Sequence, residues 1–344
     1  MNTKLGSLGI MVSTNKQRKL VLKKYLLFHS TRLKLFCFTP SDIDWEQKVI
    51  KGLHLNNRKW SVSTFPFPKV IYNRCYNSDK GIITQLESHI GSNRCFNHIT
   101  QFEKLEIHHL LARWLSPYLP DTFPYEQATL EHLLNLNKLV YVKPRHGNMG
   151  KGVYRVERKD TGEFTISSHH LLPNTIVGDM RQLQEEMGRL VGTTPHLIQK
   201  GIYTKEFNNR TFDIRVLVQK NKFGQWTATN VISRIAYKGC FNTSICERVC
   251  LTKNLLKKLY PQQNVGDMMN LFYNISLRSA EIIEIDSGIH LCEVSVDLAL
   301  DKEGHVWIIE VNGKPQKSLY DEISFQKKAV YSRPIEYARY LHNQ

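Results

Sequence analysis

The sequence predicts an α+β protein in which a small α/β unit precedes a larger part built from antiparallel sheets and helices. Up to about residue 95, short apolar runs alternate with polar stretches, which is typical of an α/β unit. From residue 139 onward, runs of alternating residues flank short turn sequences, which is typical of antiparallel hairpins. We therefore expect an N-terminal domain over 1–95, a helical linker over 96–138 and the larger domain over 139–344.

Three apolar runs predict the strands of the N-terminal unit, at residues 5–12, 33–39 and 68–76. We expect polar-faced helices between these strands, for example over 42–54. The segment before Asp42 contains eight Lys or Arg residues and no acidic residue, which favours a basic amphipathic surface.

The later elements follow from periodicity and turn signals. Apolar residues three or four apart predict a helix over 101–116, and a further helix is expected over 126–137. A strand over 139–143 is followed by a hairpin around a D-T-G turn and by two long strands within 211–237. Residues 254–285 are helical with a break at Pro261, and residues 292–312 form a last hairpin.

The chain is strongly basic, with 47 Lys and Arg against 31 Asp and Glu, and this charge of +16 implies an anionic partner. The basic–aromatic patterns of nucleic-acid modules are absent, which argues against specific nucleic-acid binding. The N-terminal apolar runs are too short to cross a bilayer, so no transmembrane segment is expected. Seven scattered cysteines without a C-x-x-C pair indicate free thiols in a cytoplasmic protein, while a zinc site at Cys240, Cys246 and Cys250 has unusual spacing.

A loop rich in glycine and cations lies between two predicted strands, in "YVKPRHGNMGKGVYRV". Glycines at 147, 150 and 152 allow the backbone N–H groups to approach a phosphate chain, and Lys143 and Lys151 add positive charge. The loop lacks the G-K-S/T ending of a Walker A motif. The alternative is an ordinary glycine-rich hairpin with solvated lysines.

Acidic residues gather on one face of the last hairpin. If a two- or four-residue turn is centred on 301–304, the numbers of any two residues that face each other across the hairpin add up to 605. Side chains then alternate between the two faces of the hairpin. One face would carry Glu293, Ser295, Asp297, Ile308, Glu310 and Asn312, and the other would carry Val294, Val296, Leu298, Trp307, Ile309 and Val311. Oxygen ligands in this arrangement suit magnesium, although an exposed acidic face is the alternative. An odd-length turn would scatter the cluster.

Two arginines are expected on one surface of a sheet. Arg215 lies on the face of strand 212–218 that is opposite to its apolar residues, and Arg234 lies on the neighbouring strand. Their guanidinium groups suit bidentate hydrogen bonding to a phosphate or a carboxylate. The alternative is that they form salt bridges with Asp213 and Glu247. The buried run 196–203 ends at Lys200-Gly201, where a backbone edge could bind a flat heterocycle or simply turn.

Taken in order, these segments resemble ATP-grasp proteins. The wording "VKPRHGNMGKGVYRV", "FDIRVLVQKN", "GQWTATNVISRIA" and "VDLALDKEGHVWIIEVNGKP" is similar to the YheC/YheD family of endospore coat-associated proteins. Upstream, "LGIMVS", "VIYNRCY" and "FNHITQFEKLEIHHLLARWLSPYLPDT" extend the resemblance to nearly the full chain. It implies an ATP-grasp fold over 139–344, preceded by a pre-ATP-grasp-like domain.

The resemblance also implies roles for individual residues toward ATP and one or two Mg²⁺ ions. The nucleotide would be bound by Lys104, Lys143, a lid containing Gly147, Gly150, Lys151 and Gly152, and a hinge at Gln199, Lys200 and Ile202. The residues facing the γ-phosphate and the acceptor would be Arg215, Arg234 and Lys151. The metal ligands would be Asp297, Glu310 and Asn312, and Glu206 is the candidate for the ribose.

Proteins of this architecture usually join a carboxylate to an amine through an acyl-phosphate, so we expect such a ligase with an unidentified acid and amine as substrates. The alternative is an ATP-binding structural protein with little or no turnover, associated with the spore coat or another anionic surface. The expected location is cytoplasmic or spore-associated.

Overall fold

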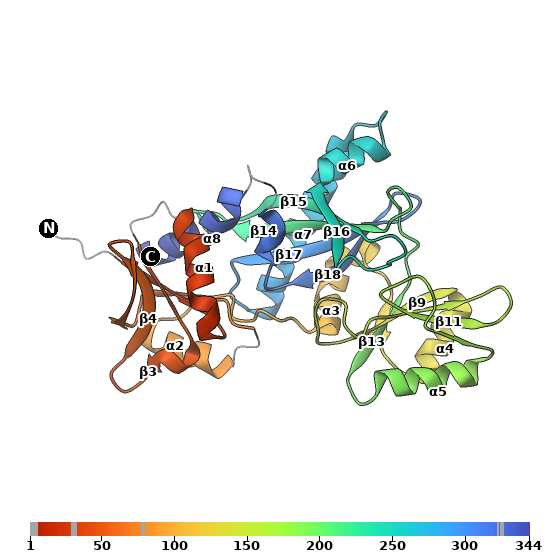
Figure 1. The fold of residues 1–344 in the computed structure, drawn as a ribbon, viewed down its shortest axis with the longest axis horizontal. Helices are drawn as coiled ribbons and strands as arrows, with labels where there is room; N and C mark the ends of the chain where they lie inside the picture. Colours follow the sequence, from red (N-terminus) through yellow and green to blue (C-terminus); the bar gives the residue numbers. More distant parts are fainter. Residues whose placement is uncertain (1–5, 29–32, 77–79, 322, 324–326) are drawn as a thin grey trace.

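The computed structural model describes residues 6–28, 33–76, 80–321, 323 and 327–344, and these residues form three sheets with helices packed against them (Figure 1). The N-terminal sheet lies at the left of the view, the third sheet lies in the centre, and the second sheet lies at the lower right. The mixture of helix with mostly antiparallel sheets confirms the predicted fold class.

The N-terminal sheet has a parallel centre, as an α/β unit requires. Strands β1 (Ser7–Met11), β2 (Lys34–Phe38), β6 (Val70–Asn73) and β7 (Cys95–Phe96) pair in parallel. The connections contain helices α1 (Asn15–Leu27) and α2 (Lys80–Ile90). The three predicted strands are confirmed, except that residue 5 lies outside the described residues.

The helix predicted over 42–54 is wrong. A short 3-10 turn (Pro40–Asp42) and β3 (Ile43–Asp44) lead into a hairpin of β4 (Val49–Asn56) and β5 (Lys59–Pro66). Every second residue of β4 is buried at Ile50, Gly52 and His54, which is strand periodicity. Asn57 and Arg58 both have positive φ, at 45° and 65°, and form the two-residue turn that closes the hairpin.

The second sheet is antiparallel and has the strand order β12-β11-β10-β9-β13-β8. Its strands are β8 (Thr122–Pro124), β9 (Leu139–Pro144), β10 (Tyr154–Arg158), β11 (Phe164–Ser168), β12 (Thr175–Val177) and β13 (His196–Lys200). Helices α4 (Gln127–Leu136) and α5 (Met180–Val191) pack with the sheet into one apolar cluster. The hairpin predicted around the D-T-G turn is β10–β11.

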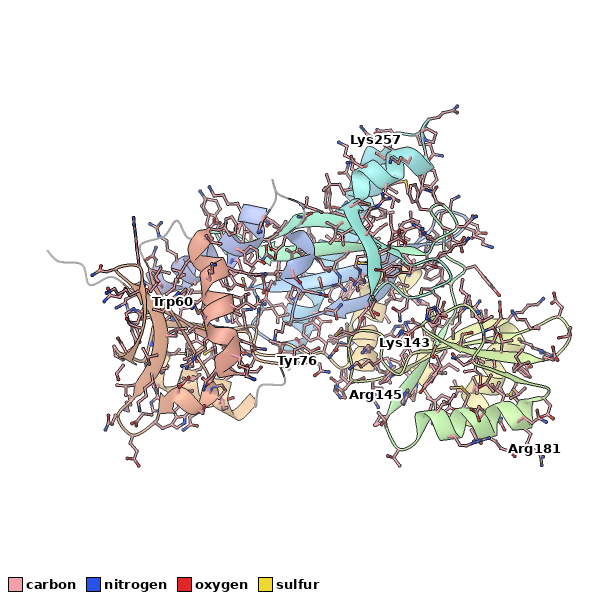
Figure 2. All side chains as sticks on the ribbon, viewed as in Figure 1. Trp60, Tyr76, Lys143, Arg145, Arg181 and Lys257 are labelled. Atoms are coloured by element: carbon pink, nitrogen blue, oxygen red, sulfur yellow. The ribbon has the colours of Figure 1, made fainter. Side chains whose placement is uncertain are left out.

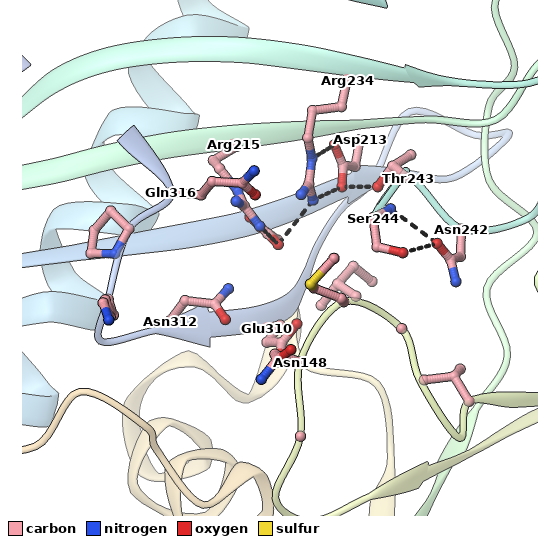
Figure 3. A pocket seen from close by; sticks show the side chains of 18 of the residues that line it. Asn148, Asp213, Arg215, Arg234, Asn242, Thr243, Ser244, Glu310, Asn312 and Gln316 are labelled. Carbon is pink, nitrogen blue, oxygen red and sulfur yellow. Dashed lines mark hydrogen bonds and ion pairs between the residues drawn. The ribbon is translucent and has the colours of Figure 1, made fainter. Parts of the chain in front are cut away.

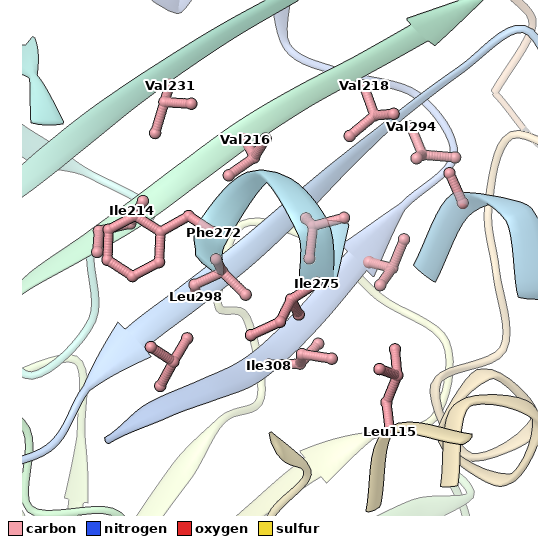
Figure 4. Packing of buried hydrophobic residues seen from close by; sticks show 14 of the residues in the cluster. Leu115, Ile214, Val216, Val218, Val231, Phe272, Ile275, Val294, Leu298 and Ile308 are labelled. Atoms are coloured by element: carbon pink, nitrogen blue, oxygen red, sulfur yellow. The ribbon is translucent and has the colours of Figure 1, made fainter. Parts of the chain in front are cut away.

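The third sheet carries the main hydrophobic core. Its antiparallel strands are β14 (Phe212–Lys220), β15 (Trp226–Ala236), β16 (Cys246–Leu251), β17 (Glu293–Leu300) and β18 (Val306–Asn312). The helices are α3 (Lys104–Leu115), α6 (Thr252–Leu259) and α7 (Val265–Ser287), so the helical segment breaks at Pro261 as predicted. Figure 4 shows Phe272 of α7 packed among Ile214 and Leu298 of the sheet.

The register predicted for the last hairpin is wrong along its length, because Asp297 faces Glu310 instead of Ile308 and Ser295 faces Asn312 instead of Glu310. Leu300 pairs with Val306 and Leu298 with Ile308, so an odd number of residues separates the two strands. A bulge at Ile309 then shifts the register, and Asp297 pairs with Glu310 and Ser295 with Asn312. Ile308 before the bulge and Val311 after it both enter the core, while Ile309 and Glu310 line the cavity described below.

The C-terminal helix α8 (Lys327–Asn343) connects the N-terminal sheet to the third sheet. One buried cluster contains Val330 and Ile335 of α8, Leu8 and Tyr72 of the N-terminal sheet, and Leu217 of β14. The N-terminal sheet therefore shares a core with the third sheet. No disulfide joins the described cysteines, and none of the described helices is both long and apolar enough to cross a membrane.

Phe272→Ala should lower the free energy of unfolding by about 3–5 kcal/mol, because Phe272 is fully buried between α7 and the third sheet. Chemical denaturation followed by circular dichroism measures the change. Ile285→Ala in the same helix is the control, since Ile285 is 74% exposed and its truncation should change stability by less than about 0.5 kcal/mol. Equal effects of both variants would contradict the assigned core.

Candidate active site

The second and third sheets, together with α1 and the residues after β6, line one cavity of about 620 Å³ (Figure 3). Most of the site residues predicted from the sequence line it: Lys104, Lys143, Gly147, Gly150, Lys151, Gln199, Lys200, Ile202, Arg215, Arg234, Asp297, Glu310 and Asn312. Gly152, Glu206 and Glu293 are not among its lining residues. The fold thus brings residues far apart in the chain to one place.

Two arginines and two aspartates form a network of ion pairs on the cavity side of the third sheet. Arg215 donates from Nε and Nη2 to the two oxygens of Asp297, each at 2.6 Å. Arg234 donates from Nη2 to Asp297 at 3.0 Å and from Nε to Asp213 at 2.9 Å. Of the salt bridges considered from the sequence, Arg234–Asp213 forms, whereas Glu247 pairs with Arg210 at 2.8 Å.

This network keeps its arginine and aspartate side chains charged. Burial alone would raise the pKa of Asp297, but Arg215 and Arg234 together lower it below its ordinary value. Within the described part of the chain, the hydrogen bonds of Arg215 and Arg234 use Nε and Nη2 and none engages Nη1. The aspartates therefore orient both guanidinium groups and leave the Nη1 of each arginine as a donor for an anion in the cavity.

Glu310 and Asn312 supply oxygen atoms next to this network of ion pairs. Glu310 lies opposite Asp297 across the strands, and its Oε1 is 3.5 Å from Nζ of Lys104. Nδ2 of Asn312 is buried without a hydrogen-bond partner among the described residues. A carboxylate and an amide at this edge fit a magnesium ion. Asp297 could join as a ligand only if an arginine released one of its oxygens.

Lys143 faces these oxygens from the second sheet. Its Nζ donates to Oε1 of Gln199 at 2.7 Å, and Nε2 of Gln199 donates in turn to Thr122 at 2.9 Å. Burial lowers the pKa of Lys143 to about 8, with Glu310 opposing the shift and Lys104 adding to it. Lys143 is therefore a partly buried cation that an added anion would stabilise.

The glycine-rich loop between β9 and β10 reaches across the cavity. Met149, Gly150 and Gly152 have positive φ, and the carbonyl of Gly147 accepts a hydrogen bond from Lys104 at 3.0 Å. A Cβ atom on Gly150 would lie 2.3 Å from Nδ2 of Asn242 and 2.8 Å from Oγ of Ser244. The tip of the loop thus docks on the segment that follows β15.

Sequence reasoning did not identify that segment or the far end of the cavity. Asn242, Thr243 and Ser244 line the cavity, and Thr243 donates to Asp213. The small polar run after a strand was the available signal. Lys314, in the quoted "NGKP", lines the cavity as well, together with Lys24 and Val21 of α1. Nothing in the local sequence indicated that α1 would reach the site.

Comparison with known proteins places the fold. The family model described as YheC/D like ATP-grasp matches residues 92–341. Endospore coat-associated protein YheD of Bacillus subtilis (strain 168) is 26% identical over 342 residues, covering 95% of this chain and 75% of that protein. Endospore coat-associated protein YheC of the same strain is 23% identical over 336 residues, covering 91% and 89%.

Solved structures agree on the architecture. D-alanyl-alanine synthetase A from Vibrio cholerae O1 biovar eltor str. N16961 has a TM-score of 0.58 at 13% identity, covering 99% of this chain and all of that chain. The ATP-grasp ligase PsnB, solved with a minimal precursor, has a TM-score of 0.58 at 12% identity, covering 96% and 99%. The structure therefore has the fold of ATP-grasp ligases.

If Lys143 contacts the phosphates of ATP, as the sequence predicts, the affinity for ATP should fall by up to about tenfold per pH unit above pH 8. The reason is that a bound phosphate favours the charged form of this lysine, whose pKa is about 8 in the free protein. Calorimetric titration at pH 7.5, 8.5 and 9.5 at constant ionic strength measures this. Lys143→Met should bind ATP more than about tenfold more weakly at pH 7.5 and lose the slope. Lys138→Met, at an exposed lysine just before the same strand, is the control. An unchanged affinity in Lys143→Met would move the phosphates elsewhere.

Gly150→Ala should reduce ATP affinity or turnover about tenfold or more without unfolding the protein, since the added Cβ prevents the loop tip from docking on Asn242 and Ser244. Gly162→Ala is the matched control: Gly162 also has positive φ, in the β10–β11 turn, but a Cβ there meets nothing within 4 Å. ATP titration and thermal unfolding of both variants separate loss of docking from backbone strain. A wild-type ATP affinity and turnover for Gly150→Ala would contradict the lid assignment.

Proposed function

This chain belongs to the YheC/YheD-like ATP-grasp family, and we propose that it is an ATP- and magnesium-dependent ligase that joins a carboxylate to an amine. The observation that supports this most is the cavity in which Lys143 of the second sheet faces Glu310, Asn312 and Arg215 of the third. Such an arrangement places cations and oxygen ligands on opposite sides of a space that suits a triphosphate and its metal.

The cavity residues divide into three tasks under this proposal. Gln199, Lys200 and Ile202, at the end of β13, form the edge for the base. Lys104, Lys143 and the loop 147–152 would neutralise and cover the phosphates, and Glu310 and Asn312 would hold magnesium with Asp297 as an exchangeable third ligand. ATP bound there would transfer its γ-phosphoryl group to the acceptor's carboxylate and leave as ADP. An amine would then attack the acyl-phosphate, forming the amide and releasing inorganic phosphate.

Arg215 and Arg234 stabilise the charge that develops during transfer. Asp213 and Asp297 fix both guanidinium groups before any ligand arrives, so the arginines need little reorganisation. The loop with Lys151 then covers the site and keeps water from the activated acid. In this mechanism the chain contributes orientation and charge, and no side chain acts as a covalent nucleophile.

A second candidate is an ATP-binding protein that associates with the spore coat or another anionic surface and turns over little or no ATP. Two observations favour it: the names of the YheD and YheC relatives, and helix α1, whose sequence NKQRKLVLKKYLL has five cations and no acidic residue. Tight ATP binding without ADP release, with any acid or amine, would support this candidate over the ligase.

Glu310→Gln should lower magnesium-dependent ADP release by more than about a hundredfold, because the change removes a charged metal ligand. Coupled detection of ADP with pooled acids and amines, over a magnesium titration, measures this. Glu303→Gln, at an exposed position in the turn of the same hairpin, is the control and should keep wild-type rates. Normal rates in Glu310→Gln would remove Glu310 from the proposed metal site.

A further inference from the structure

The cavity extends beyond β18 to a second end that faces the N-terminal unit. Its wall consists of α1, the residues after β6 and the segment after β18. We refer to Lys24, Tyr25, Arg74, Tyr76, Lys314 and Lys317 as the basic end. Figure 2 shows Tyr76 beside the N-terminal unit and Lys143 beside the second sheet, so the two ends of the cavity lie apart.

The basic end has more positive charge than the surrounding carboxylates balance. Lys317 pairs with Glu293 at 2.7 Å, and Arg74 lies 3.5 Å from the same carboxylate. Arg74 also donates to the hydroxyls of Tyr25 and Tyr72, which are neutral. Lys24 pairs with Asp321 at 2.7 Å. Three cations thus share two carboxylates.

Lys314 is the cation without an anionic partner among the described residues of this end. Its Nζ lies 4.8 Å from the ring centre of Tyr76. Lys314 is part-buried and lies close enough to Arg74 for the two cations to repel each other. A part-buried cation next to another cation is unfavourable unless an anion joins them, and the cavity offers room for that anion.

The path from the reaction centre to Lys314 is short. Glu310 and Asn312 of β18 line the cavity, and so do Lys314 and Gln316 in the segment that follows the strand. Four residues of extended chain span at most about 14 Å between the Cα atoms of Glu310 and Lys314. Arg215 and Lys314 line the same cavity, so an acid of suitable length can contact Arg215 with one end and Lys314 with the other.

We propose that the carboxylic acid substrate carries a second anionic group, which Lys314 and Arg74 bind at the basic end. This rests on the proposed ligase function and narrows its substrate class to dianionic acids, with a second carboxylate or a phosphate-type group. Arg215 binds the carboxylate that is activated. Val21 and Leu20 of α1 provide apolar contacts for the carbon chain, and Leu20, at 63% exposure, lies where the cavity opens to solvent.

The test measures binding to protein saturated with magnesium and a non-hydrolysable ATP analogue. Succinate, glutarate, adipate and pimelate are titrated calorimetrically, each against its own monomethyl ester, which differs by one charge. At least one diacid should bind tenfold or more tightly than its ester. A parallel titration with 4-phosphonobutyrate distinguishes a phosphate-type group from the carboxylate of glutarate.

Lys314→Met should abolish the preference for the diacid and leave affinity for the ATP analogue unchanged, whereas Lys314→Arg should retain the preference. Lys302→Met, at an exposed lysine in the β17–β18 turn, is the matched control. Circular dichroism confirms that each variant is folded.

Equal binding of every diacid and its ester, or no binding of any of them, would overturn the inference. A preference that survives in Lys314→Met would overturn it as well. In these cases the ATP analogue still binds and the proposed function stands. Failure of the wild-type protein to bind the analogue would instead overturn the proposed function.

Discussion

Each strand of a sheet has only two faces, and this constraint organises the third sheet. Phe212, Ile214, Val216 and Val218 of β14 turn toward α7 and form the core. The residues between them must then face the other way, which puts Asp213 and Arg215 into the cavity. The same alternation places Asp297 beside Arg215. Burial of the apolar face thus determines where the charges lie.

The bulge at Ile309 extends this constraint to β18. Val306 and Ile308 are in the core, so strict alternation would also turn Glu310 inward. One extra residue reverses the alternation, and Glu310 and Asn312 face the cavity while Val311 enters the core. The bulge therefore lies between the part of the strand that packs and the part that lines the site.

The charged side chains that line the cavity are also placed so that the cavity favours the binding of anions. Asp213 and Asp297 neutralise the two arginines and hold them in fixed orientations, whereas Lys143 and Lys314 are partly buried and their pKa values are lowered. Cations held in a partly desolvated site gain more from an incoming anion than solvated ones do. The N-terminal sheet completes this arrangement, because its core shared with α8 brings α1 and Arg74 against the cavity.

The sequence by itself determined the fold class, most strands and helices, and part of the set of residues that line the cavity, because alternation, turn residues and motif order are local signals. It misplaced residues 42–54, where Asn57 and Arg58 close a hairpin without glycine, and it predicted the wrong register for the last hairpin. Only the tertiary structure decided that Asp297 pairs with both arginines, that Gly150 docks on Asn242, and that Lys314 lacks an anion among the described residues. The first of these facts depends on which strands pair within the third sheet, and the other two depend on how separate parts of the chain pack together. No local pattern records the distance between residues that are far apart in the sequence.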